Sequence, residues 1–169
     1  CRLPGAVFLH CDRDLSGPMT GTNGRHPLPD AGLLAARLAG IGMGPQTQVV
    51  VYDDAQGMIA ARLWWLLRWL GHDRVAVLDG GWQAWTDANG ALNCMPAERQ
   101  PGNFTATLRD AWVNADYVQE FIDTSRMYLV DARSADRFRG ENETIDPVAG
   151  HIPGASNRFF RDNLQEDGR

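Results

Sequence analysis

Several thiol, imidazole and carboxylate side chains lie near the start of the chain, and these residue types indicate which reactions the chain could carry out. The thiols are Cys1, Cys11 and Cys94. A thiol becomes a nucleophile when a helix N-terminus or a neighbouring cation lowers its pKa. None of the three stands between a predicted strand and a following helix. We therefore expect no nucleophilic cysteine among these residues.

The same cysteines could in principle bind a metal or form a disulfide. They are odd in number and contain no C-x-x-C pair, which favours free thiols and a reducing, cytoplasmic setting. His10 and Cys11 lie near Cys1 in the sequence. However, adjacent residues of an extended segment point to opposite faces, and no fourth ligand has the spacing of a zinc site. The sequence therefore predicts no metal and no cofactor.

The composition is that of a folded globular protein. Of 169 residues, 44% are hydrophobic and 22% are charged, which argues against disorder. The net charge of −5 argues against nucleic acid and membrane surfaces as partners. No apolar run approaches the roughly 18 residues that a bilayer-crossing helix needs.

Strand patterns and helix patterns alternate along the chain. Apolar or β-branched runs predict buried strands at residues 6–9, 48–53, 74–79 and 127–133. Helical patterns cover residues 31–42 after the cap Asp30, residues 58–71 up to Gly71, residues 80–90 as a turn and short helix, residues 113–125 with Asn114 as cap, and residues 134–140. This alternation predicts an α/β fold with a parallel sheet covered on both faces.

A change in composition divides the chain. Residues 90–103 contain two prolines and no apolar period, which predicts a linker. We therefore expect an N-terminal domain at 1–90, a linker at 91–110 and a second domain beginning at 111–169. The phrase LPGA at residues 3–6 returns as IPGA at residues 152–155, 149 residues later, a spacing typical of a domain.

Several longer phrases follow one another in a fixed order. They are LPGAVF, VVVYDD, RLWWLLRWLGH, VLDGGWQAW, and LVDARSADRFRGE with GHIPGA behind it. In these phrases the chain resembles the tandem-domain sulfurtransferases of the rhodanese family. The resemblance implies a rhodanese-like parallel sheet with helices on both faces, in one nearly complete domain without its first strand. It also implies the start of a second, catalytic-type domain that stops before its active loop.

The resemblance also implies an activity. Such proteins move a sulfane sulfur from thiosulfate or 3-mercaptopyruvate to a thiophilic acceptor, such as cyanide or a thiol, through a cysteine persulfide. Asp53 and Asp54 stand where a working loop carries its cysteine, which implies a degenerate loop in the first domain. An acidic cap for the next helix explains them equally well. The nucleophile is then expected beyond this chain, and the fragment itself is expected to be inactive.

The resemblance assigns supporting roles to four further residues. Arg133 and Arg137 match arginines that bind the anionic group of the donor, although ion pairs with Asp131 or Asp136 would explain them too. Asp12 and His26 match a proton-handling arrangement, against the simpler explanation of hydrogen bonds that stabilise a loop. The loop ENETIDPVAG lacks the further arginine of mercaptopyruvate enzymes, which favours the thiosulfate type.

Small-molecule sulfur donors and acceptors are therefore the expected partners. A non-catalytic, rhodanese-like binding or regulatory module is the alternative. For the fragment itself, we expect residues 127–133 to fill the vacant strand position beside residues 45–80, within one chain or in a strand-exchanged dimer.

Overall fold

The computed structural model describes all residues, 1–169, which form two compact units, Cys1–Asp110 and Ala111–Arg169. The first unit contains, in order, α1 (Cys11–Asp14), α2 (Ala31–Gly40), β1 (Val49–Val51), α3 (Met58–Trp69), β2 (Val75–Val77) and α4 (Gly81–Asp87). The second contains α5 (Ala115–Phe121), β3 (Val130–Asp131), α6 (Ala135–Arg139), β4 (Ser156–Asn157) and the 3-10 helix η1 (Phe160–Asn163). The α/β class predicted from the sequence is confirmed, although each unit has a parallel sheet of only two strands.

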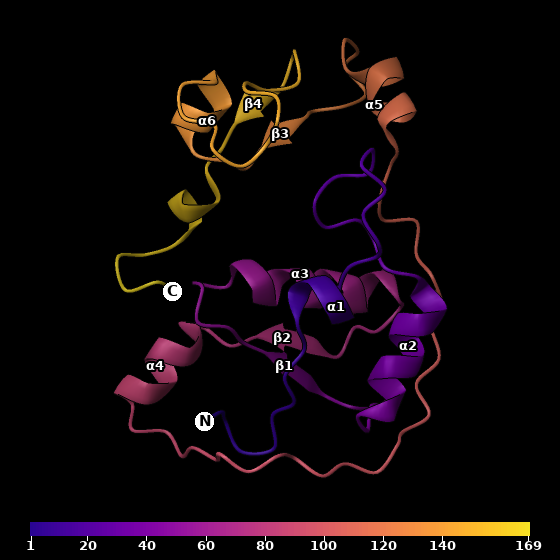
Figure 1. Cartoon of the computed structure of the whole chain (residues 1–169), viewed down its shortest axis with the longest axis vertical. Coiled ribbons are helices and arrows are strands. Elements are labelled where there is room, and N and C mark those ends of the chain that lie inside the picture. Colours follow the sequence, from indigo (N-terminus) through magenta and orange to yellow (C-terminus); the bar gives the residue numbers. More distant parts are fainter. The chain divides into compact units, whose positions relative to one another are not determined.

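The sheet of the first unit is built from two valine-rich strands, Val-Val-Val and Val-Ala-Val. β1 and β2 pair in parallel, with Val49 opposite Val75 and Val51 opposite Val77. The connection between them is α3, which contacts both strands and lies along the pair (Figure 1). Valine favours this geometry because its branched side chain packs well on a pleated surface.

Local capping signals set the helix ends. The Asp30 carboxylate accepts a hydrogen bond from the Leu33 N–H and starts α2 as predicted. Gly71, with φ +86°, follows α3 in the left-handed conformation, which ends the helix. Gly80 takes the same conformation (φ +70°) just before α4. In the second unit, the Asn114 side chain accepts from the Tyr117 N–H and caps α5.

The hydrophobic core lies in the first unit, mainly between α2, α3 and the sheet. Leu66 and Leu67 of α3 are completely buried, as expected for a helix that is apolar on most sides. The buried hydrophobic residues of the helices and loops around them include Leu15, Leu34, Leu38, Met43, Trp69, Leu70 and Phe104. Phe104 belongs to the segment predicted as a linker. This segment runs along the first unit, where the Thr107 N–H donates to the Leu70 carbonyl.

The strand predicted at residues 6–9 does not form, so that prediction is wrong. In the second unit the equivalent phrase does form a strand: the Ser156 N–H donates to the Leu129 carbonyl, and β4 pairs in parallel with β3. Residues 6–9 pair with no strand and have no regular secondary structure. A strand exists only through hydrogen bonds to a neighbour, so the same local sequence gives different structure in the two units.

Two further expectations are wrong. Within the chain, the segment around Val130 pairs with β4 and not with any strand at residues 45–80, so the expected filling of the vacant strand position within one chain is wrong. The strand-exchanged dimer stays a prediction. Cys1 and Cys94 form a disulfide across 93 residues of sequence, where no disulfide was expected. The free cysteines from which a cytoplasmic setting was predicted are reduced to one by that bond, so the prediction loses its support.

Every helix falls short of the length and hydrophobicity that a membrane span needs.

Candidate functional site

The loop between β1 and α3 surrounds a carboxylate with backbone amides. Asp53 lies two residues beyond the end of β1, and its Oδ1 accepts hydrogen bonds from the N–H groups of Ala55 (2.9 Å) and Gly57 (2.8 Å). Its Oδ2 accepts from those of Ile59 and Ala60, both at 2.7 Å. Four amides at the start of a helix thus converge on one anion. We call this arrangement the amide cradle.

The backbone of this loop takes the conformation that the cradle requires. Gln56 and Gly57 both have positive φ (57° and 82°), and of these two residues Gly57 donates its N–H to Asp53. The Asp53 carbonyl accepts the N–H of Trp82 at 2.9 Å, so α4 holds the same residue from its other side. A Cβ on Gly81 would come within 2.7 Å of that carbonyl, which explains the glycine.

The electrostatics of the cradle favour an anion. Partial burial of the Asp53 carboxyl raises its pKa, but the amides of Ala60, Ala55, Gly57 and Ile59 outweigh this effect and bring the pKa below its ordinary value. Asp54 is exposed and lies outside the cradle. Of the two carboxylates predicted to mark a degenerate loop, Asp53 alone therefore occupies the anion position.

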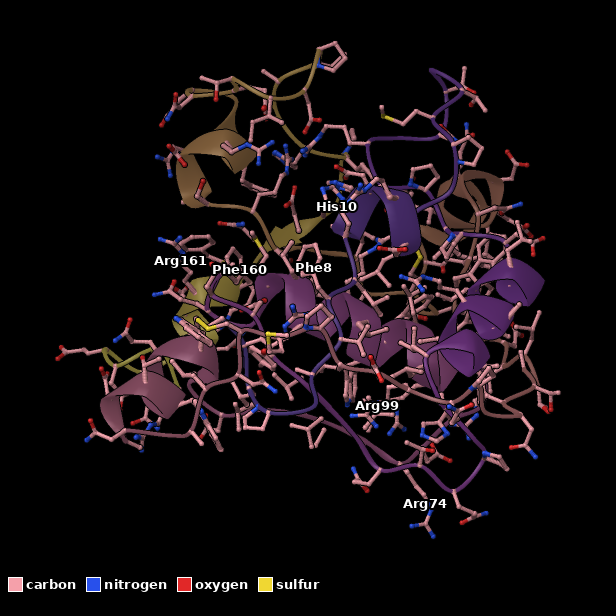
Figure 2. All side chains as sticks on the ribbon, turned by 60° about the horizontal axis from the view of Figure 1, so that its bottom comes forward. Phe8, His10, Arg74, Arg99, Phe160 and Arg161 are labelled. Atoms are coloured by element: carbon pink, nitrogen blue, oxygen red, sulfur yellow. A yellow bond between two sulfur atoms is a disulfide. The ribbon has the colours of Figure 1, made fainter.

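An open pocket of about 1100 Å³ adjoins the cradle in the first unit. Its walls include Asp53, the residues of β1, and the segment from Gly5 to Cys11. Phe8 and His10 lie on that segment, which leads into α1 (Figure 2). The pocket gives a small molecule access to one side of the cradle loop.

Asp12 and His26, predicted as a pair, are brought together. His26 Nε2 lies 3.0 Å from Asp12 Oδ1. Both side chains are well exposed to solvent, which suits groups that exchange protons with a bound substrate or with water. The geometry is compatible both with proton handling and with a loop-stabilising contact.

Arg62 of α3 positions His26, and sequence reasoning missed it. Its guanidinium donates to the carbonyls of Leu15, His26 and Pro27, at 2.8–3.1 Å, and to Ser16 Oγ at 3.2 Å. One side chain thereby fixes the loop that carries His26. The available signal was an arginine near the start of a mostly apolar helix, whose other arginine, Arg68, lies in the last turn.

Arg133 and Arg137 of the second unit lie in an ion-pair network. Arg133 follows β3 and pairs with Asp131 (2.6 Å), and it also donates to the Gly150 carbonyl. Asp131 is the partner that the simpler explanation named. The guanidinium of Arg133 lowers the pKa of Asp131 below its usual range.

Glu143 joins the two arginines and was not predicted from the sequence. Its side chain is only 3% exposed and accepts from Arg137 at 2.9 Å and from Arg133 at 3.4 Å. Arg137 also pairs with Asp146 at 2.9 Å, in the loop that lacks the further arginine. Backbone N–H groups of Asp146 and Ile145, with the Arg137 guanidinium, lower the pKa of Glu143 to about 2 against the cost of burial. Any donor anion must compete with these carboxylates for the arginines.

None of the three thiols occupies an amide cradle. Cys1 and Cys94 are bonded to each other, and Cys11 is free. Cys11 opens the four-residue helix α1 and lines the pocket, but the next amide, that of Asp12, donates to His10 Nδ1. The converging amides of the first unit are engaged by Asp53 instead.

A comparison with known families settles what kind of domain this is. The model of the rhodanese-like domain matches residues 1–88, which is just over half of the 169 residues. The chain belongs to the rhodanese-like domain family. The resemblance inferred from the sequence phrases is thereby confirmed.

Relatives with curated names match nearly the whole chain. A Pseudomonas aeruginosa protein named "Probable 3-mercaptopyruvate sulfurtransferase" is 49% identical over 171 residues, covering 99% of this chain and 60% of its own length. The human 3-mercaptopyruvate sulfurtransferase is 36% identical, with 98% and 57% covered. The bovine thiosulfate sulfurtransferase is 33% identical with the same coverage. The chain therefore spans about 60% of the length of the relatives it matches.

Solved structures of this rhodanese-like type have the same fold. The crystal structure of the 3-mercaptopyruvate sulfurtransferase SseA from Escherichia coli superposes with a TM-score of 0.85 at 30% identity. The match covers 98% of this chain and 62% of the other. The rhodanese fold predicted from the sequence is thus confirmed.

Proposed function

We propose that the protein to which this chain belongs is a sulfurtransferase that moves a sulfane sulfur from thiosulfate or 3-mercaptopyruvate to a thiophilic acceptor. The names of the relatives support this, because both donors occur among them. In the reaction a cysteine thiolate takes the sulfur as a persulfide, and the acceptor then removes it. The sulfur-carrying cysteine is not Cys1, Cys11 or Cys94.

The amide cradle around Asp53 is the observation that carries this proposal. A loop that directs four amides at one side chain after a strand is suited to stabilise an anion, whether a thiolate or a persulfide. Here the anion is a carboxylate, which cannot carry sulfur. We therefore assign the first unit, with Asp53 and Asp54, as the non-catalytic partner of a catalytic domain that begins within residues 111–169.

The supporting residues keep their proposed roles. Arg133 and Arg137 would bind the anionic group of the donor, since a guanidinium pairs bidentately with sulfonate or carboxylate oxygens. Such binding requires the donor to displace a carboxylate from the network around Glu143. Asp12 and His26 would handle the proton that moves when mercaptopyruvate or the acceptor reacts.

The first experiment is the thiosulfate–cyanide assay on the 169-residue chain. We expect no thiocyanate above the uncatalysed rate, because no thiol sits in a cradle. Turnover at enzyme-like rates that disappears in Cys11→Ser would contradict our assignment of the cysteines. The coding sequence beyond Arg169 gives an independent test: a strand followed by a loop that bears cysteine supports the enzyme.

A non-catalytic binding module is the second candidate. It is favoured by the carboxylate in the cradle and by the carboxylates that already engage both arginines. Aspartate or serine in the corresponding loop of the second domain would support it. So would full-length protein that gains no sulfur from thiosulfate or 3-mercaptopyruvate.

A further inference from the structure

The turn at α1 and the loop after it bring together three metal-ligating groups of different chemistry. The Sγ of Cys11, a carboxylate oxygen of Asp12 and a ring nitrogen of His26 all lie within 4.8 Å of one another. We propose that these three side chains form a binding site for Zn²⁺. The site uses neither the Asp53 cradle nor the arginines of the second unit.

The local backbone explains why the sequence pattern argued against a metal here. That argument assumed an extended segment, in which Cys11 and Asp12 would point to opposite faces. The structure instead begins a helical turn at Cys11, so successive side chains are only about 100° apart around the axis. His10 fixes this turn, because its Nδ1 accepts the N–H of Asp12.

The third ligand is brought in from a separate loop. Arg62 donates to the Leu15 carbonyl beside α1 and also to the carbonyl of His26. One guanidinium therefore ties the end of the Cys11 turn to the residue that supplies the imidazole. The backbone that carries His26 is therefore tied to the Cys11 turn before any ion arrives, which reduces the entropy lost on binding.

The set of donor atoms favours zinc over the common hard cations. A thiolate and an imidazole suit Zn²⁺, whereas Mg²⁺ and Ca²⁺ select oxygen ligands. Zinc bond lengths of roughly 2.0–2.3 Å place the ligands of one tetrahedral ion about 3–4 Å apart, so small side-chain rotations close the site. Three protein ligands leave the fourth position to water.

Binding changes the protonation and contacts of these residues. The Cys11 thiol loses its proton to solvent as the zinc–sulfur bond forms, and no group changes oxidation state. His26 Nε2 and Asp12 Oδ1, now 3.0 Å apart, must turn from each other toward the ion. Bound zinc and the Asp12–His26 contact therefore exclude each other, and zinc would block any proton transfer through this pair.

Co²⁺ gives a spectroscopic test on the full chain. Without reductant the Cys1–Cys94 disulfide stays closed, so Cys11 is the free thiol. We expect one Co²⁺ per chain, a thiolate-to-cobalt charge-transfer band and the visible bands of tetrahedral cobalt, all removed by Zn²⁺. Cys11→Ser should abolish the charge-transfer band, and His26→Gln should weaken binding by about tenfold or more.

His151→Gln is the matched control for the imidazole. It removes an exposed histidine of the second unit, and the glutamine amide can still donate to the Phe138 carbonyl that His151 contacts. This variant should titrate like the parent. Absence of a thiolate band in the parent would overturn the proposal. So would a band that survives Cys11→Ser, or equal affinities for His26→Gln and His151→Gln in chains whose circular dichroism shows an intact fold. These outcomes do not depend on sulfurtransferase activity.

Discussion

Asp53→Cys would place a thiol where four amides now converge on a carboxylate. The sulfur would take the position of the carboxyl carbon, and the longer hydrogen bonds that sulfur accepts would make up for the missing oxygens. Asp54→Cys is the matched control, because it introduces a thiol one residue further on, in an exposed position outside the cradle. The pair isolates the effect of the cradle from that of the neighbouring sequence.

The size of the effect follows from the hydrogen bonds. An ordinary cysteine has a pKa of about 8.5, and cysteines at helix N-termini fall to roughly 3.5–7.5. The cradle lowers the pKa of Asp53 even though burial acts in the opposite direction. We expect the thiol pKa in Asp53→Cys to lie at least one unit below that in Asp54→Cys, which corresponds to about 1.4 kcal/mol.

The pH dependence of alkylation by iodoacetamide measures both pKa values. Sulfur uptake is the second readout: the thiolate attacks the sulfane sulfur of thiosulfate, sulfite leaves, and the protein gains the mass of one sulfur atom. Peptide mapping distinguishes the new thiol from Cys11. If both variants fold and their thiols titrate at the same pH, the amides do not stabilise an anion and the cradle argument fails.

Three further outcomes are expected. The pKa of Glu143 is about 2 against an ordinary 4.5, so its ionised form stabilises the second unit above about pH 4.5. That contribution should be lost as the pH falls toward 2, which is visible as lost dispersion in NMR spectra of that unit. Arg62→Met should speed hydrogen exchange in the loop that carries His26, whereas Arg68→Met on the same helix should not. Phe104→Ala should lower the free energy of unfolding of the first unit by about 3–5 kcal/mol in denaturant titrations, since Phe104 is only 6% exposed.

Each of these three predictions can be contradicted by its measurement. A second unit that is equally well folded at pH 2 and pH 6 would show that Glu143 does not stabilise it through its charge. Equal exchange in the Arg62 and Arg68 variants would mean that the guanidinium does not hold the loop. Leu108→Ala, at a position that is 56% exposed, is the control for Phe104, and equal losses would place Phe104 outside the core.

The predictions from the sequence succeeded where the physical cause is local. Asp30 and Asn114 start helices because their side chains reach an amide three residues ahead. Gly71 ends α3 as predicted, because glycine tolerates positive φ. The valine-rich strands β1 and β2 could also be predicted, since branched side chains favour strands.

The predictions failed where the cause is contact between distant segments. Residues 6–9 carry a strand pattern but form no strand, because no neighbouring strand pairs with them. The equivalent phrase beside β3 does form a strand. The Cys1–Cys94 bond depends on how the chain returns after 93 residues, and no spacing rule reports that.

At the candidate site, the sequence predicted the types of residue but not which residues contact one another. From the sequence we could predict an aspartate after a strand, a histidine near another aspartate, and two arginines behind a second strand. The three-dimensional fold was needed to show that four amides close around Asp53 and that Arg62 holds the loop of His26. It was also needed to show that Glu143 links Arg133 with Arg137. The sequence alone gives the residue types. Contacts between residues depend on the path of the backbone through the fold, and the packing of the core determines that path.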